Sequence, residues 1–282
     1  MIELAAAFAV AGAASNAVGT AFQRKAASTS RRGGVRILAE LIRRPAWLLG
    51  MAGVIGAALF QSLALVNGPL ALVQPLFILE LPFALLVAGP LMHRRLPRSG
   101  WRGVGGVVTG LAVLLVAAAP HGATDQARLV RWLPALGLCL GGMAAAILLA
   151  GRGHAAARRA ALLAAASATG NALTAAMLKS ATGTFADHGF LAFLRSWQTY
   201  GFAVMGAGAV VLLENALQAG PLAASQPALT IGDAMVSLAL GITLFDERIR
   251  TGWWLVPEVC GAVLIVVGVV VLSRAAQNLT VR

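Results

Sequence analysis

The phrase GPLALVQP at residues 68–75 returns as GPLAASQP at residues 220–227, and each copy opens a long apolar stretch. The same spacing continues beyond the phrase without a gap, because it also pairs Trp101 with Trp253. A repeated hydrophobic unit is typical of membrane transporters built from two halves, whose binding site lies where the halves meet. The phrase therefore predicts a duplicated membrane protein.

The composition also predicts an integral membrane protein. Hydrophobic residues make up 59% of the 282-residue chain and charged residues only 11%, whereas a soluble domain averages about 25% charged residues. The two cysteines, Cys139 and Cys260, lie in apolar segments, so we expect small buried side chains and no disulfide framework. The net charge is +12, and the basic residues that cause it lie between the apolar segments. This distribution argues against a nucleic-acid-binding face.

Nine segments are long and apolar enough to cross a bilayer, for which about 20 residues are needed. The sequence thus predicts an all-α integral membrane protein with about nine transmembrane helices. The predicted spans are 3–23, 47–67, 69–92, 101–119, 131–150, 157–180, 198–216, 221–244 and 253–273. A ten-span variant stays open, since residues 183–197 could form a surface helix or a short re-entrant piece.

The positions of lysine and arginine predict the orientation. With the N-terminus outside, segments 24–46, 93–102, 151–159 and the C-terminal tail face the cytoplasm and hold 16 of the 22 basic residues. We therefore expect a multi-pass plasma (inner) membrane protein with a cytoplasmic C-terminus. Residues 34–46 are typical of an amphipathic helix on the inner surface. Arginines outnumber lysines by 20 to 2, which favours a GC-rich bacterial origin.

With this orientation, the span that begins with the first copy of the phrase runs inward, and the span that begins with the second copy runs outward. The first span also has a counterpart, because Asn16-Ala17 matches Asn171-Ala172. We therefore expect two inverted repeats of four spans each, residues 1–119 and 157–282, with residues 120–156 as a joining span.

These residues resemble the drug/metabolite transporter superfamily, with its EamA-like and NIPA-like branches. The repeated phrase, the short turn at Phe245–Arg248 and the Gly-rich span after it carry the resemblance, whereas the first half has the basic His93–Arg95 at the matching turn. Residues 22–25 and 44–47 are similar to the nine-span NIPA-like branch. The resemblance implies a transporter fold over nearly the whole chain, and for some of that branch it implies magnesium transport.

Two acidic residues fall deep in predicted spans, one after each copy of the phrase. At 1.5 Å per residue, Glu80 lies about 16 Å and Asp233 about 18 Å into its span. The hydrocarbon layer is about 30 Å thick, so both lie near its middle, where ionisable residues are functional candidates. We expect them to bind substrate or protons, or a metal cation if that is the cargo. Alternatively, they are inert protonated groups held by Ser237, Gln74 or a backbone carbonyl.

Amides and prolines recur near these acids. Side chains that could line the same path are Gln74, Gln226, Asn16 and Asn171. Prolines expected to kink the spans are Pro75, Pro82 and Pro227. The alternatives are interhelical hydrogen bonds for the asparagines and bundle-shaping kinks without a binding role for the prolines.

Two further acids lie close to predicted span ends. Glu258 is near the outer end of the last span, and Glu214 is near the inner end of the seventh. Either could guard a gate. Glu214 is expected to be a solvated boundary carboxylate, because side chains at span ends reach water.

The sequence therefore predicts a secondary transporter that moves a small solute or cation by alternating access, with proton coupling through the deep acids. A divalent-cation carrier, with magnesium as cargo, is the alternative, and a non-transporting membrane scaffold is the alternative from another class. No enzyme motif and no cofactor-binding motif occurs in the chain. The expected partners are the bilayer and the cargo, and the oligomeric state stays open, a homodimer included.

Overall fold

The computed structural model describes residues 1–28, 45–91, 97–122, 124, 126–152 and 155–280. Within these residues the chain is helical, with one 3-10 turn, η1 (Gly252–Trp254), and one antiparallel bridge between His121 and Arg248. The helices are α1 (Ile2–Ser28), α3 (Pro45–Asn67), α4 (Leu70–Phe77), α5 (Glu80–Leu91), α6 (Arg98–Ala118), α7 (Leu129–Ala150), α8 (Ala156–Arg195), α9 (Trp197–Ala219), α10 (Leu222–Phe245) and α11 (Leu255–Thr280).

Nine stretches among the described residues are long and apolar enough to cross a membrane. This confirms the expected all-α membrane class. Residues 183–195 do not supply a tenth span, because they continue α8 to Arg195, with a break at Gly189 where φ is +80°. The amphipathic helix expected at residues 34–46 lies outside the described residues, apart from the start of α3.

The third predicted span is broken in its middle. α4 ends at Phe77 and α5 begins at Glu80. Pro82 has no N–H to donate to the Ile78 carbonyl one turn earlier, and its ring would crowd that carbonyl. The Leu81 N–H donates to Ile78 O instead, at 3.2 Å, which tightens the turn. The sequence analysis expected a kink at Pro82, and the break falls on the residues just before it.

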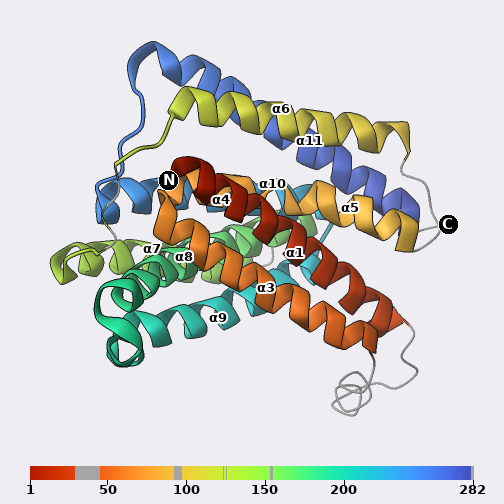
Figure 1. The fold of residues 1–282 in the computed structure, drawn as a ribbon. Coiled ribbons are helices and arrows are strands. Elements are labelled where there is room, and N and C mark those ends of the chain that lie inside the picture. Colours follow the sequence, from red (N-terminus) through yellow and green to blue (C-terminus); the bar gives the residue numbers. More distant parts are fainter. Residues whose placement is uncertain (29–44, 92–96, 123, 125, 153–154, 281–282) are drawn as a thin grey trace.

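Small residues let the helices pack in close pairs. α1 packs mainly on α3, α8 on α9, and α6 on α11, and the crossing of α6 with α11 is visible at the top of Figure 1. At that crossing a Cβ on Gly110 would lie 2.7 Å from the Gly261 carbonyl, and a Cβ on Gly261 would lie 2.7 Å from the Gly110 carbonyl. Only glycine permits this approach of the two backbones.

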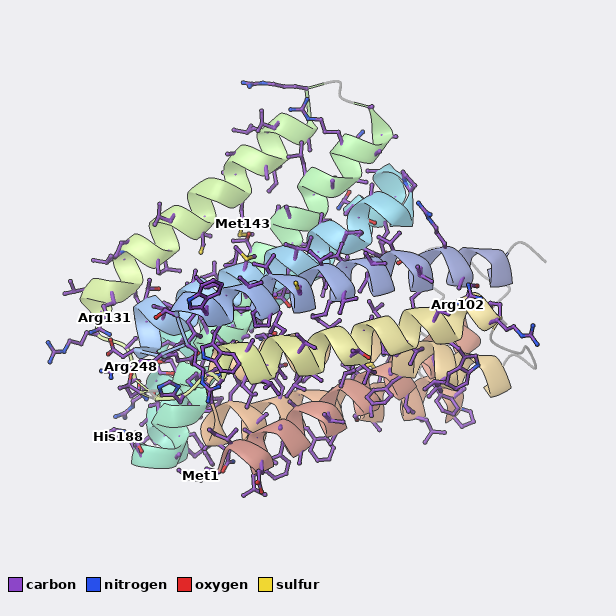
Figure 2. The ribbon with its side chains drawn as sticks, turned by 90° about the horizontal axis from the view of Figure 1, so that it is seen from above. Met1, Arg102, Arg131, Met143, His188 and Arg248 are labelled. Carbon is purple, nitrogen blue, oxygen red and sulfur yellow. The ribbon has the colours of Figure 1, made fainter. Side chains whose placement is uncertain are left out.

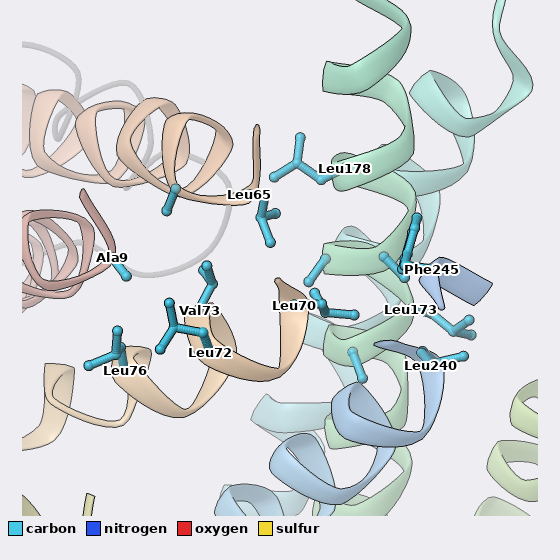
Figure 3. Close-up of a cluster of buried hydrophobic side chains, with 14 of the residues drawn as sticks. Ala9, Leu65, Leu70, Leu72, Val73, Leu76, Leu173, Leu178, Leu240 and Phe245 are labelled. Carbon is cyan, nitrogen blue, oxygen red and sulfur yellow. The ribbon is translucent and has the colours of Figure 1, made fainter. Parts of the chain in front are cut away.

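α4 lies at the centre of the molecule. Its Leu70 and Val73 are fully buried in one cluster with Leu173 of α8 and Leu240 of α10 (Figure 3). This cluster therefore packs α4, from the first half of the chain, against helices of the second half.

The helices run between two ends of the bundle. In Figure 2, Met1, Arg131, His188 and Arg248 lie at one end and Arg102 lies at the opposite end. The sequence analysis predicted the first four to be outside and Arg102 to be inside. The structure groups these residues as that prediction requires. Which end faces the cytoplasm stays a prediction.

Candidate functional site

A cavity of about 180 Å³, open to the surface of the bundle, lies between α4, α6, α10 and α11. Its lining residues Ile231, Met235, Leu255 and Val259 are 43–63% exposed. Its wall is aliphatic, and typical lining side chains are Ile78, Leu114, Met235 and Ile265. α4 and α6 come from the first half of the chain and α10 and α11 from the second, so both halves contribute to the wall. Ligand pockets are usually of this kind, apolar with a few polar groups that fix orientation.

Glu258 is the ionisable residue among those that line the cavity. It lies in the first turn of α11, beside the lining residues Leu255 and Val259. Its Oε2 is buried and has no hydrogen-bond partner within the described ranges of the chain. The N-terminus of a helix favours a negative charge, whereas a buried carboxylate oxygen without a donor is unfavourable. This arrangement suits a cationic guest in the cavity.

The two deep acids lie elsewhere, each against a different hydroxyl. Thr20 of α1 places its Oγ1 3.4 Å from Glu80 Oε1 and 2.6 Å from the Asn16 carbonyl. Ser237 places its Oγ 3.4 Å from Asp233 Oδ1, on the same face of α10. Neither acid is among the cavity-lining residues. The Ser237 contact is the one that the inert-packing alternative anticipated for Asp233.

The other sequence candidates are distributed around these groups. Pro75 lines the cavity, and Gln74 beside it is buried. The remaining amides, Gln226, Asn16 and Asn171, are half-buried and are not among the lining residues. Pro227 lies inside α10, which continues past it, and Glu214 is exposed on α9.

The sequence analysis missed a buried ion pair at the end of the bundle that holds Met1. Lys179 Nζ lies 3.6 Å from Glu247 Oε1, and both side chains are at most 1% exposed. Neither residue was a site candidate in the sequence, where residues 245–248 were expected to form a short turn. Glu247 instead turns inward, while its neighbour Asp246 stays exposed and pairs with Arg131 at 2.6 Å.

The ion pair satisfies two helix ends at once. The Leu70 and Ala71 N–H groups at the start of α4 donate to the two Glu247 oxygens at 2.6 and 2.9 Å. Lys179 donates to Gly68 O at 2.8 Å and to Leu65 O, near the end of α3, at 3.3 Å. Helix N-termini favour anions and helix C-termini favour cations. The pair therefore joins α3, α4, α8 and the connection from α10 to α11.

Burial raises the pKa of the Glu247 carboxyl above its ordinary value, because the ionised form loses its hydration. The Lys179 ammonium and the two backbone N–H groups act in the opposite direction and favour the ionised form. Gly241 makes room for this carboxylate, since a Cβ at that position would overlap Glu247 Oε2.

The ion pair lies next to the cavity. Ala71, whose N–H binds Glu247, is itself a lining residue. The connections at this end are also tied together: His121 and Arg248 exchange two backbone hydrogen bonds, and the Arg250 N–H donates to the Ala118 carbonyl. Polar contacts therefore tie the connections together at this end of the bundle.

One sequence signal could have indicated the pair. The phrase that begins α4 supplies no side-chain cap, since the helix follows Gly68-Pro69 and starts with Leu70. The first N–H groups of a buried helix need acceptors. An acid in a connection at the same end, such as Glu247, was a candidate for that role.

The chain resembles a bacterial protein over nearly its full length. It is 26% identical, over 97% of this chain and 96% of the other, to an uncharacterized protein of Corynebacterium glutamicum. No family model matches the chain. No solved structure matches it either.

Proposed function

We propose that the protein is a secondary transporter that moves a small solute or cation across the plasma membrane by alternating access. The cavity between α4, α6, α10 and α11 is the observation that carries the proposal. It lies among membrane-compatible helices, takes its wall from both halves of the chain and contains a carboxylate. A scaffold without cargo has no need of such a cavity.

Matched contacts in the two halves support the proposed inverted repeat. A Cβ on Gly68 would lie 2.5 Å from the Ala5 Cβ of α1, and one on Gly220 would lie 3.1 Å from the Ala160 Cβ of α8. The glycine of each phrase thus packs against the first helix of its own half. Within each half a serine of the first helix also donates to a backbone carbonyl of the second, Ser15 to Gly53 O and Ser167 to Ala209 O, both at 2.8 Å, although the two serines are not equivalent positions of the repeat.

The proposal gives the deep acids a proton-carrying role and gives the cavity to the cargo. Asp233 lies between the lining residues Ile231 and Ala234 in the sequence of α10. A change in its protonation would alter its contact with Ser237 and hence the wall that this helix contributes. Glu80 lies at the break between α4 and α5, where a small rotation of α5 would move it relative to Thr20.

The proposal is tested in two steps. A thermal-shift screen with magnesium, amines, amino acids and nucleotides first finds a ligand, because a ligand at a thousand times its Kd stabilises the folded state by about 4 kcal/mol. Flux of that ligand into proteoliposomes is then measured for wild type, Asp233→Asn, Glu80→Gln and Asp187→Asn. A hit with magnesium alone would favour the divalent-cation carrier.

We expect each deep-acid variant to lower the initial flux by about tenfold or more, the effect of losing one charged hydrogen bond. Asp187, an exposed residue of α8, is the matched control, and its variant should transport like wild type. Unchanged flux in both Asp233→Asn and Glu80→Gln would remove their proton-carrying role. No flux of any ligand in wild type would favour the scaffold.

A further inference from the structure

We propose that the cavity binds a small aliphatic ammonium ion, with the cationic nitrogen on Glu258 and the hydrocarbon portion against the aliphatic wall. This inference rests on the proposed function and names the chemical class of its cargo. Glu258, which the sequence suggested as a gate residue, thereby takes the cargo-binding role that was expected for Glu80 and Asp233.

The polar groups of the wall define the charge of the guest. Among the residues that the structure describes, Glu258 and Thr230 are the only lining residues whose side chains carry an oxygen atom, and no lysine, arginine or histidine lines the cavity. A guest that pairs with the ionised form of Glu258 neutralises its negative charge and supplies a donor to Oε2, which has no hydrogen-bond partner among the described residues. A single ammonium group does both.

A divalent metal ion fits the same wall poorly. Magnesium takes six oxygen ligands and keeps waters where the protein supplies few. Here one carboxylate and one hydroxyl would face an ion whose waters would meet leucine, isoleucine, valine and methionine side chains. Those side chains accept no hydrogen bonds, so the hydrated ion would leave most of its waters unsatisfied.

The apolar lining residues determine which kind of hydrocarbon group the cavity can bind. None of the lining residues in the described part of the chain is aromatic, so these residues offer no ring faces that bind quaternary or aromatic cations by cation–π attraction. Ile78, Leu114, Met235 and Leu238 instead offer branched and flexible apolar surface. A straight or branched alkyl chain gains from its burial there.

The test is equilibrium dialysis of radiolabelled hexylammonium against purified protein in phosphatidylcholine nanodiscs, with empty nanodiscs as the background. Neutral lipid removes non-specific attraction of the cation to the bilayer. Uncharged hexanol, of similar length, reports apolar binding alone. The first variant is Glu258→Gln, which keeps the shape of the side chain. The second is Asp187→Asn, which removes an exposed carboxylate of α8 that does not line the cavity. Ala262→Leu, a lining position, fills the cavity without changing charge.

We expect saturable binding to wild type and to Asp187→Asn, and a Kd raised by about tenfold or more in Glu258→Gln. Ala262→Leu should also weaken binding, and hexanol should bind wild type much more weakly than hexylammonium. The inference is overturned if wild type does not bind, if Glu258→Gln binds as well as wild type, or if hexanol binds equally. Binding that depends on Glu258 in a protein that moves no cargo would support the site and contradict the transport proposal. Cargo flux through wild type, together with unchanged hexylammonium binding in Glu258→Gln, would support the transport proposal and contradict the site.

Discussion

At the scale of single residues, the buried pair of Lys179 and Glu247 is the most consequential feature outside the cavity. Its charges are held by helix ends as well as by each other, because Glu247 accepts from the start of α4 and Lys179 donates near the end of α3. The Lys179 ammonium also lies 5.3 Å from the centre of the Phe245 ring. Removing either charge would leave the other buried without its counter-ion.

We therefore expect Glu247→Gln to lower the free energy of unfolding by about 3–5 kcal/mol, the usual effect of breaking one side of a buried ion pair. Asp246→Asn is the control, because the neighbouring pair with Arg131 is exposed and should contribute about 0–1 kcal/mol. Unfolding of purified protein in mixed detergent micelles with increasing SDS measures both.

The double variant Lys179→Met with Glu247→Gln sharpens this prediction. Its loss of stability should be smaller than the sum of the two single losses, since no unpaired charge is left in the interior. Equal effects of Glu247→Gln and Asp246→Asn, or additive effects in the double variant, would mean that the buried pair does not hold this end of the molecule.

At the scale of helices, the pairing of α6 with α11 sets the shape of the cavity. Leu114 and Ala118 of α6 and Glu258 and Val259 of α11 all line it. The two helices meet through Gly110 and Gly261, with backbone facing backbone. The distance between the two helices at this contact therefore controls both stability and the width of the binding site.

Gly110→Ala should push α6 away from α11, because the added Cβ would lie 2.7 Å from Gly261 O and 2.8 Å from Ile265 N. Overpacking of this kind costs about 1–3 kcal/mol. Gly105→Ala, on the same helix and with nothing within 4 Å of the added Cβ, should change stability by less than about 0.5 kcal/mol. The SDS titration used above compares the two variants, and equal stabilities would contradict the close helix crossing.

At the scale of the whole molecule, the cavity takes its wall from both halves of the chain and lies next to the buried ion pair. Ala71 connects the two, because its N–H donates to Glu247 and the residue lines the cavity. The halves also share the central cluster around Leu70. Movement of one half against the other would change the ion pair and the cavity together, as alternating access requires.

Much of this architecture could be predicted from the sequence, because it depends on local patterns. Span lengths follow from apolar runs, the starts of α4 and α10 from the repeated phrase, and the break before Glu80 from Pro82. The site was harder to predict. Depth along a span predicts a level for Asp233 in the bilayer but not the neighbours of its side chain, which meets Ser237 outside the cavity lining.

The ion pair escaped prediction for a different reason. Glu247 and its partners Leu70 and Ala71 are separated by more than 170 positions in the chain, and Lys179 resembles the bases that flank many spans. Only the packed structure brings these residues to one place. Glu258, in contrast, was visible as an acid near a span end, yet its partnerless oxygen and its cavity become apparent only in three dimensions.

The central claim is that the cavity opens alternately to the two sides of the membrane, and the accessibility of one lining position tests it most directly. Ala234, a cavity-lining residue of α10, is replaced by cysteine after Cys139 and Cys260 are changed to alanine. Membrane-impermeant maleimide is then added to right-side-out and to inverted vesicles. His188→Cys and Arg102→Cys, at opposite ends of the bundle (Figure 2), report the two sides.

Alternating access predicts that Ala234→Cys is labelled in both kinds of vesicle. His188→Cys should be labelled only in right-side-out vesicles and Arg102→Cys only in inverted ones. Labelling of Ala234→Cys in a single vesicle orientation, with both controls labelled as expected, would contradict alternating access and identify the cavity as a fixed pocket.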